Sequence, residues 1–162
     1  MRKPLNDMKL RQLQYGKYDP VSNSYGMVRR SHKRAHQGWD LTAPPGTPVF
    51  AITNGELTTG FSHSYGNWAS LKFKYGGHTR YAFYGHLQAT TGSNCSVTEG
   101  ALIGFTGRTG NASKIPHAEA HLHFEIRTLQ NPAHGLHGHH DPLHGRIDPG
   151  EVLGYEIYQC SP

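Results

Sequence analysis

Closely spaced turn-forming residues are the feature that most restricts how this chain can fold. From Pro44 onward, groups of glycine, proline, asparagine or serine recur between short runs of other residues, and the 162 residues include 20 glycines and 10 prolines. Glycine raises the entropic cost of a helix interior, and proline lacks the N–H group that a helix interior uses. A helical bundle or a coiled coil is therefore excluded, and short elements joined by tight turns are expected.

The runs between these turns are rich in residues typical of β-strands. The predicted strands cover residues 47–52, 56–61, 68–74, 79–86, 102–105, 121–127 and 155–158, and a short helix is predicted at residues 7–14. Tight turns favour antiparallel pairing of consecutive strands. We expect a mainly β, single-domain fold, an antiparallel sheet or small sandwich with long loops and little helix.

Net charge and hydropathy limit the classes of molecule that this chain can bind. The formal net charge is +5 and the mean hydropathy is −0.63. No run approaches the roughly 18 apolar residues of a membrane span, so no integral membrane segment is predicted. A basic chain prefers anionic surroundings such as nucleic acid, a membrane surface or a bacterial cell wall. Nucleic acid is disfavoured because the basic residues are scattered, apart from a cluster at residues 29–34, and no nucleic-acid-binding module is recognisable.

The only two cysteines, Cys95 and Cys160, are far apart in the sequence and form no Cys-x-x-Cys pair. They cannot build a zinc ribbon. A disulfide in an oxidising compartment and two free thiols are both compatible with the sequence. A bridge would contribute roughly 4 kcal/mol in the chain-entropy model.

Histidines are frequent, 13 in all, and two of them lie in the run His-Leu-His-Phe-Glu-Ile at residues 121–126. Because strand side chains alternate between faces, His121, His123 and Glu125 share one face, and the three apolar residues share the other. Two imidazoles on a rigid strand suit a metal site or an acid–base site. The alternative is a polar outer face that happens to contain two histidines.

Two further histidines stand beside residues suited to the same chemistry. His36 and Asp40 are four residues apart, but Gly38 and the prolines that follow Asp40 disfavour a helix. In a loop that enters a strand, both side chains can still converge on one cation, since imidazole and carboxylate suit zinc. His86 ends the predicted strand 79–86, where alternation places it on the same face as Tyr84.

Taken in order, the motifs His-x-x-x-Asp, Tyr-Gly-His-Leu and His-Leu-His-Phe-Glu resemble those of the lysostaphin-type zinc metallopeptidases, which cut peptide bonds in bacterial peptidoglycan. The resemblance runs from about residue 25 to residue 155 and implies a groove that holds the metal. It includes segments 40–49, 54–57, 104–111 and 148–149. Two segments depart from the family pattern, a long loop at 111–120 and a histidine-rich loop at about 129–146. The bond that is cut is therefore not specified, since D-Ala–diaminopimelate and glycyl bonds both belong to this family.

The resemblance also implies one Zn²⁺ per chain, bound by His36, Asp40 and His123, with His121 and His86 as catalytic residues beside a zinc-bound water. Zinc lowers the pKa of such a water toward about 7. One free imidazole can then carry the proton, and the other can donate to the developing oxyanion. Spacing alone does not say which of His121 and His123 binds the metal. Glu125 either supports a ligand or is a solvated strand residue.

Three functions are compared. The first is a zinc-dependent endopeptidase that hydrolyses the peptide cross-links of peptidoglycan. The second is a non-catalytic cell-wall-binding or hydrolase-regulating domain of the same fold, but such relatives typically lack ligands that are present here. The third is a metal buffer built around the histidine-rich loop, which would not explain Asp40 or the β scaffold. The complete residue set favours the enzyme.

We expect residues 1–24 to be an N-terminal extension and residues 25–162 to be the zinc metallopeptidase domain, a monomer. Such an enzyme acts on peptidoglycan peptide stems in the periplasm or cell wall. The first residues contain no apolar segment of a signal peptide, so secretion by another route, or a trimmed chain, is expected. Delivery to rival cells as an antibacterial toxin effector is one such route, and it would add immunity or delivery partner proteins.

Overall fold

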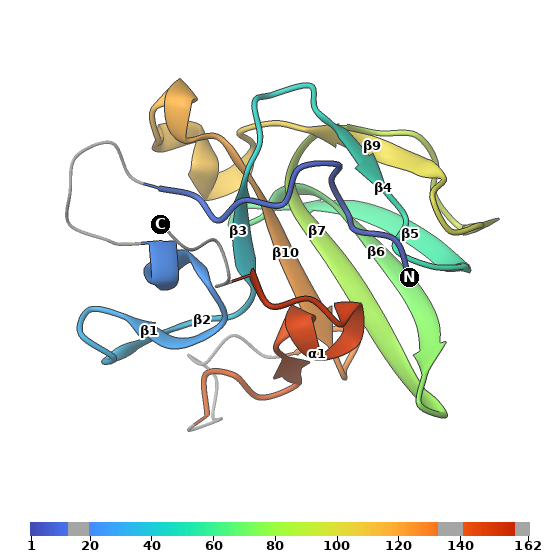
Figure 1. Ribbon diagram of the computed structural model, residues 1–162. Helices are drawn as coiled ribbons and strands as arrows, with labels where there is room; N and C mark the ends of the chain where they lie inside the picture. The colour runs from blue at the N-terminus through green and yellow to red at the C-terminus, as the bar shows by residue number, and fades with distance from the viewer. Residues whose placement is uncertain (13–19, 133–140, 158–162) are drawn as a thin grey trace.

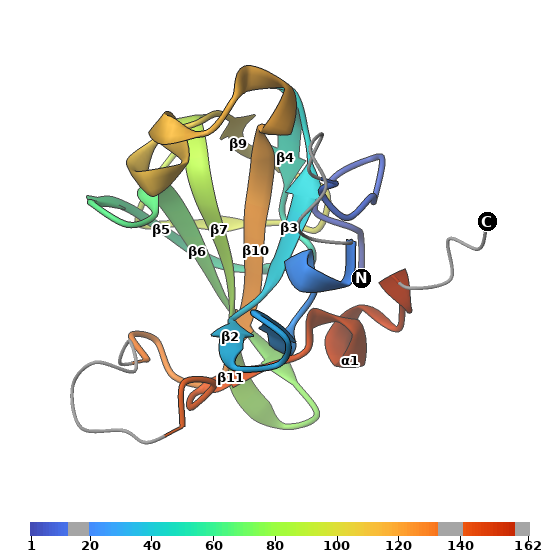
Figure 2. The same ribbon diagram turned by 90° about the vertical axis from the view of Figure 1, so that its left-hand side faces the viewer.

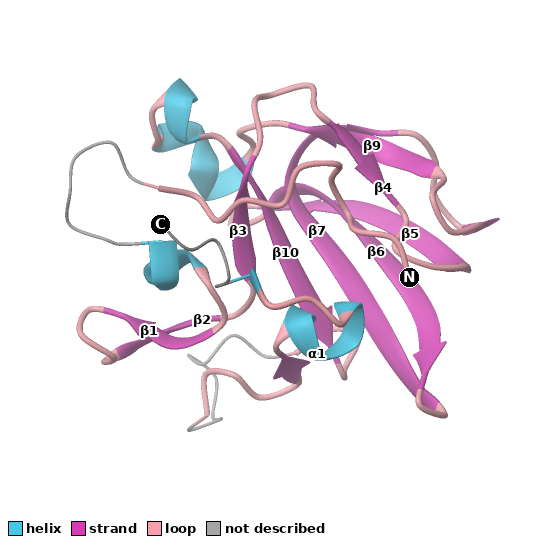
Figure 3. Cartoon of the chain, in the orientation of Figure 1, coloured by secondary structure: helices cyan, strands magenta, loops and turns pink. Residues whose placement is uncertain are grey.

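A computed structural model describes residues 1–12, 20–132 and 141–157, and most of this part of the chain is antiparallel β-structure (Figure 1). The strands are β1 (Gly26–Arg29), β2 (Arg34–His36), β3 (Trp39–Thr42), β4 (Pro48–Phe50), β5 (Gly55–Ser62), β6 (Gly66–Tyr75), β7 (His78–Thr90), β8 (Cys95–Val97), β9 (Leu102–Thr106), β10 (His121–Arg127) and β11 (Arg146–Ile147). The helical elements are three 3₁₀ turns, η1 (Pro20–Asn23), η2 (Gly110–Lys114) and η3 (His117–Glu119), and one short helix, α1 (Pro149–Leu153). Figure 3 shows how little of the fold is helical.

The main sheet follows the order β11-β10-β7-β6-β5-β8, and β3 also pairs with β10. Figure 2 shows β10 between β3 and β7, which gives its side chains neighbours on both flanks. Strands β4 and β9 pair with each other and join the sheet through β7, while β1 and β2 form a separate ribbon. Every one of these pairings is antiparallel, so the predicted mainly β, antiparallel fold class is confirmed.

The core lies against one face of β10, as the alternation predicts. Leu122, Phe124 and Ile126 are fully buried in an apolar cluster that includes Trp39 of β3 and Tyr84 of β7. Burial of each such side chain contributes roughly 1.5–3 kcal/mol relative to its exposure. The opposite face of β10 is left for polar side chains.

Two predicted elements are wrong. Residues 7–12 are extended rather than helical, because their backbone bonds to β3: Arg11 N donates to Asp40 O at 2.8 Å, and Thr42 N donates to Lys9 O at 2.8 Å. A helix this short is marginal alone, so sheet pairing prevails. Residues 155–157 form no strand and follow the left-handed Gly154 that ends α1. Residues 13, 14 and 158 lie outside the described residues.

The N-terminal segment runs from β4 toward β3 across the sheet (Figure 1). Phe50 N donates to Pro4 O at 3.0 Å, and Leu5, Met8 and Leu10 are buried in the core cluster. The division of the chain at residue 24 stays a prediction. Within the described residues, no helix is long and apolar enough to span a membrane.

Candidate metal centre and active site

The β2–β3 turn brings His36 and Asp40 onto the polar face of β10. Asp40 of β3 lies directly opposite His123 of β10 in the strand register, which places the two side chains in contact. Gly38, between them, lies so close to β10 that a Cβ atom there would be 2.1 Å from Phe124 O. Only glycine permits this approach, so the turn is held directly on the strand.

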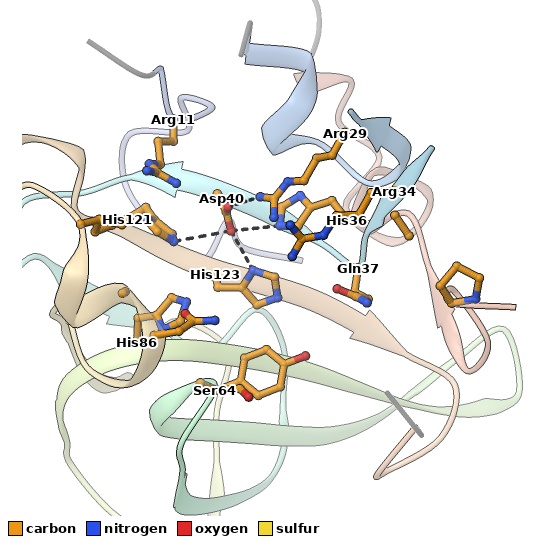
Figure 4. A pocket seen from close by; sticks show the side chains of 16 residues that line it. Arg11, Arg29, Arg34, His36, Gln37, Asp40, Ser64, His86, His121 and His123 are labelled. Carbon is orange, nitrogen blue, oxygen red and sulfur yellow. Dashed lines mark hydrogen bonds and ion pairs between the residues drawn. The ribbon is translucent and has the colours of Figure 1, made fainter. Parts of the chain in front are cut away.

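Three donor atoms meet at this point (Figure 4). His123 Nδ1 lies 2.7 Å and His36 Nε2 lies 3.1 Å from the same carboxylate oxygen, Asp40 Oδ1. The three ligand atoms lie within 4.8 Å of one another, and all three residues are buried. The structure thus brings together the three predicted metal ligands.

Each of these donors is fixed by a second contact. His36 Nδ1 lies 2.8 Å from Ser24 O, and His123 Nε2 lies 2.9 Å from Glu125 Oε1. The other oxygen of Asp40, Oδ2, accepts a hydrogen bond from Arg29 Nη2 at 2.7 Å. Such outer contacts are typical of metal ligands, because they set the ring orientation. Two imidazoles and one carboxylate, all oriented inward, fit a zinc ion with a fourth position left for water.

His121 lies on the same face of β10 as His123, as predicted, but at greater distance from the carboxylate. Its Nε2 is 3.7 Å from Asp40 Oδ1, and its Nδ1 is 3.1 Å from Glu119 O. The ring centroids of His121 and His86 are 5.1 Å apart. The two predicted catalytic histidines therefore lie beside each other next to the three donors.

The predicted face of His86 is wrong, although its side chain lines the same cavity as the three candidate ligands. Tyr84 is fully buried in the core, whereas His86 lines the site cavity. The cause is a left-handed backbone at His86, φ 62°, which interrupts the alternation of side chains along β7. His86 N donates to Tyr65 O at 2.7 Å, and His86 Nδ1 lies 2.9 Å from Thr109 O. A strained conformation held by such contacts is typical of functional positions.

Glu125 is buried and contacts His123, a candidate ligand, so it is not a solvated strand residue. It is fully buried, and its Oε1 contacts His123 and accepts a hydrogen bond from Tyr65 Oη at 2.7 Å. Its Oε2 accepts from Arg127 Nε at 2.7 Å and from Arg146 Nε at 2.9 Å. The alternation of side chains along β10 places Arg127 on the same face as Glu125, so the sequence could have predicted this partner. Tyr65, Arg146 and Arg29 come from other segments, and nothing in their spacing predicts that they reach the site.

Burial and neighbouring charges set the protonation of these groups. Burial lowers the pKa of His36 and of His121, and it lowers the pKa of His86 to about 3. Burial also opposes protonation of His123, but its hydrogen bonds to two carboxylates prevail and raise its pKa to about 9. Burial would raise the pKa of Asp40, yet the adjacent histidines hold that pKa well below its usual range.

The donors open into a cavity of about 720 Å³. Its lining includes both catalytic candidates and all three ligand candidates, together with polar groups from the 62–66 turn and from η2. The lining residues are Arg11, Arg29, Arg34, Ala35, His36, Gln37, Asp40, Ser64, Tyr65, His86, Asn111, Ala112, Ile115, His121, His123 and Pro142.

Comparison with known protein families agrees with the family resemblance that the sequence motifs indicate. The profile described as "Peptidase family M23" matches residues 34–135, which contain every ligand and catalytic candidate. The chain belongs to peptidase family M23. The predicted resemblance to lysostaphin-type peptidases is confirmed, while the roles of the individual residues stay predictions.

Relatives of this M23 chain are named as peptidases, and one of them is named as a peptidoglycan endopeptidase. It is 36% identical over 121 residues to the DD-carboxypeptidase/endopeptidase Mpg of Neisseria meningitidis serogroup B, covering 71% of this chain and 26% of that protein. It is 28% identical over 102 residues to the peptidoglycan DD-endopeptidase ShyA of Vibrio cholerae, covering 62% and 22%. The chain thus spans about a quarter of the length of these curated relatives.

A solved structure agrees in fold. The catalytic domain of the antimicrobial peptidase lysostaphin from Staphylococcus simulans superposes with a TM-score of 0.61 at 26% identity. The match covers 82% of this chain and 90% of that domain. This chain therefore has a counterpart for nearly the whole fold of the lysostaphin catalytic domain.

Proposed function

We propose that this chain is a zinc-dependent endopeptidase that hydrolyses the peptide cross-links of bacterial peptidoglycan. The observation that carries the proposal is the convergence of three donor residues, His36, Asp40 and His123, whose ligand atoms lie within 4.8 Å of one another, with two further imidazoles in the same cavity. A non-catalytic cell-wall-binding domain would need neither a complete donor set nor His121 and His86 beside it. The name of the relative ShyA, a peptidoglycan DD-endopeptidase, supports the peptidoglycan substrate.

His36, Asp40 and His123 are the residues that would hold the zinc ion. When bound, zinc supplies a Lewis acid that acidifies water and polarises the carbonyl of a peptide bond. The protein holds the ligand nitrogens in place through Ser24 and Glu125, and Arg29 holds the carboxylate. Prior orientation of this kind reduces the reorganisation that metal binding requires.

His121 is the proposed proton carrier. Glu119 O can only accept, so the contact of His121 Nδ1 with it fixes the hydrogen on Nδ1. The lone pair of Nε2 then points toward the side of the site where Asp40 Oδ1 lies, 3.7 Å away. An imidazole in this tautomer can take a proton from water and return it to the leaving amine.

His86 has the same tautomer, because its Nδ1 faces the carbonyl oxygen of Thr109. In the neutral ring, Nε2 is an acceptor, so His86 can donate to an oxyanion only after it has taken up a proton. We assign it the second acid–base position, with donation to the developing charge following proton uptake.

The enzyme would act in the periplasm or cell wall, where its substrate lies. The experiment that tests the function is digestion of purified peptidoglycan by the zinc-loaded protein, with the released peptides identified by mass spectrometry. Release of uncross-linked stem peptides, lost on chelation and restored by zinc, supports the proposal. Intact cross-links after incubation with the zinc-loaded protein would contradict it.

A further inference from the structure

Arginines outnumber carboxylates in the lining of the site cavity. Arg11, Arg29 and Arg34 come from three separate segments, and Asp40 is the one carboxylate among the described residues that line it. Figure 4 shows Arg29 and Arg34 beside His36, with Arg11 on the other side, next to His121. Like charges around a concave site raise the local concentration of an anionic substrate.

Two of the three arginines already have carboxylate partners. Arg11 Nη2 lies 2.7 Å from Glu119 Oε2, and Arg29 Nη2 lies 2.7 Å from Asp40 Oδ2. The Nε of Arg29 also donates to Ser22 O at 2.9 Å. These contacts hold both side chains in place and partly satisfy their charges.

Arg34 differs from them. It is exposed at the start of β2, and among residues 1–12, 20–132 and 141–157 no hydrogen bond or ion pair links its side chain to another group. It is the register partner of Arg29 in the β1–β2 ribbon, so two like charges stand directly opposite each other. Like charges directly opposite each other are destabilising, and of these two arginines only Arg29 has a carboxylate partner, Asp40, within the described residues.

Arg34 lies close to the candidate metal ligand His36. Arg34 and His36 are two residues apart on β2 and therefore point to the same face. Their Cα atoms are separated by roughly 7 Å, about the length of two residues of an extended peptide. A substrate strand that places its scissile carbonyl near His36 would place a neighbouring residue within reach of the guanidinium.

We propose that Arg34 binds a free carboxylate of the substrate, close to the scissile bond. A guanidinium fork matches a carboxylate through two parallel hydrogen bonds, which a neutral group cannot reproduce. The substrate class is then an anionic stem peptide whose cross-linking residue keeps its carboxylate, rather than a neutral glycine bridge. This inference rests on the proposed function and specifies its substrate.

The test compares one cross-linked muropeptide dimer in two forms, with free diaminopimelate carboxylates and with the same carboxylates amidated. For the zinc-loaded protein, kcat/KM should be about tenfold or more higher for the free form, with the difference mainly in KM, because a charged hydrogen bond is lost on amidation. In Arg34→Gln this ratio should fall toward one. Arg34→Lys, which keeps the charge but loses the fork, should give an intermediate ratio.

Lys33→Gln is the matched control, since Lys33 is an exposed neighbour outside the cavity lining and loses the same unit charge. It should keep the wild-type ratio, and all three variants should hold as much zinc as the wild type. Equal cleavage of both dimers by the wild type, or an unchanged ratio in Arg34→Gln, would overturn the inference and leave the endopeptidase function standing. Cleavage of neither dimer would overturn the function and the inference together.

Discussion

At the scale of single residues, the site is organised by two buried carboxylates with different tasks. Asp40 supplies the oxygen on which His36 and His123 converge, whereas Glu125 holds His123 from behind. A buried carboxylate is costly unless its oxygens are paired, and Glu125 is paired on both. The site therefore has its geometry fixed by ion pairs before a metal binds.

Glu125→Gln tests this supporting role. The substitution keeps the shape but removes the charge that faces His123 and the two buried arginines, so zinc affinity should fall about 10–100-fold. The free energy of unfolding should fall by about 3 kcal/mol, because buried arginines lose their counter-charge. Zinc titration and urea denaturation measure the two effects.

Glu56→Gln is the control for that measurement, because Glu56 is exposed and pairs with the exposed Lys72 at 3.2 Å. It should change stability by less than about 1 kcal/mol and leave zinc affinity alone. Wild-type zinc affinity in Glu125→Gln would mean that Glu125 does not orient the ligand.

At the scale of elements, the site depends on backbone segments that pack in direct contact. The β2–β3 turn lies on β10 through Gly38, and the 62–66 turn lies on the start of η2 through Gly66 and Gly110. A Cβ at Gly110 would be 2.2 Å from Gly66 N. These contacts place His36, Asp40 and His86 relative to a strand that is distant in sequence.

Gly38→Ala should damage the metal centre without touching a ligand. The new Cβ would be 2.1 Å from Phe124 O, so the turn has to move away from β10 and carry Asp40 from His123. Overpacking of this kind typically costs 1–3 kcal/mol. Zinc content after dialysis should fall well below that of Gly92→Ala, where the nearest atom to a Cβ is Cys95 Sγ at 3.4 Å. Equal zinc in the two variants would refute this account of the turn.

The elements that the sequence predicted well are those with a strong local pattern. Strand 121–127 is predicted with its observed bounds, because its alternation is strict and its apolar face meets the core. Strands β2 and β3 are three and four residues long and are stabilised by pairing with other segments. No local sequence pattern therefore predicts them. The candidate donors follow from the resemblance of the ordered motifs to those of lysostaphin-type peptidases, because spacing alone does not distinguish His121 from His123. The left-handed His86, and the partners Tyr65 and Arg146, depend on tertiary contacts that spacing does not encode.

At the scale of the whole molecule, the donors link parts of the chain that are far apart in sequence. His36 and Asp40 belong to the N-terminal quarter, and His123 belongs to β10, which pairs with both β3 and β7. The N-terminal segment adds buried side chains and bonds to β3 next to Asp40. A bound metal would therefore tie the β2–β3 segment to the main sheet and stabilise the folded state.

Zinc should raise the melting temperature of this protein. A ligand that binds only the folded state contributes about 2.7 kcal/mol at a free concentration of 100 times Kd. For a chain of this size the rise is about 5–10 °C. Differential scanning calorimetry with chelator and then with zinc measures it, and Asp40→Ala should melt at one temperature in both conditions. A zinc-dependent rise that persists in Asp40→Ala would place the metal elsewhere.

The proposed function assigns metal binding and catalysis to two different histidines on one face of β10. His123 Nδ1 lies 2.7 Å from Asp40 Oδ1, whereas His121 Nε2 lies 3.7 Å from it. The most direct test measures zinc content and peptide release from peptidoglycan for His121→Ala and His123→Ala side by side. We expect His121→Ala to keep about one zinc and lose 10²–10⁴-fold in turnover, and His123→Ala to lose both zinc and activity. A metal-free His121→Ala, or one with wild-type turnover, would contradict the account.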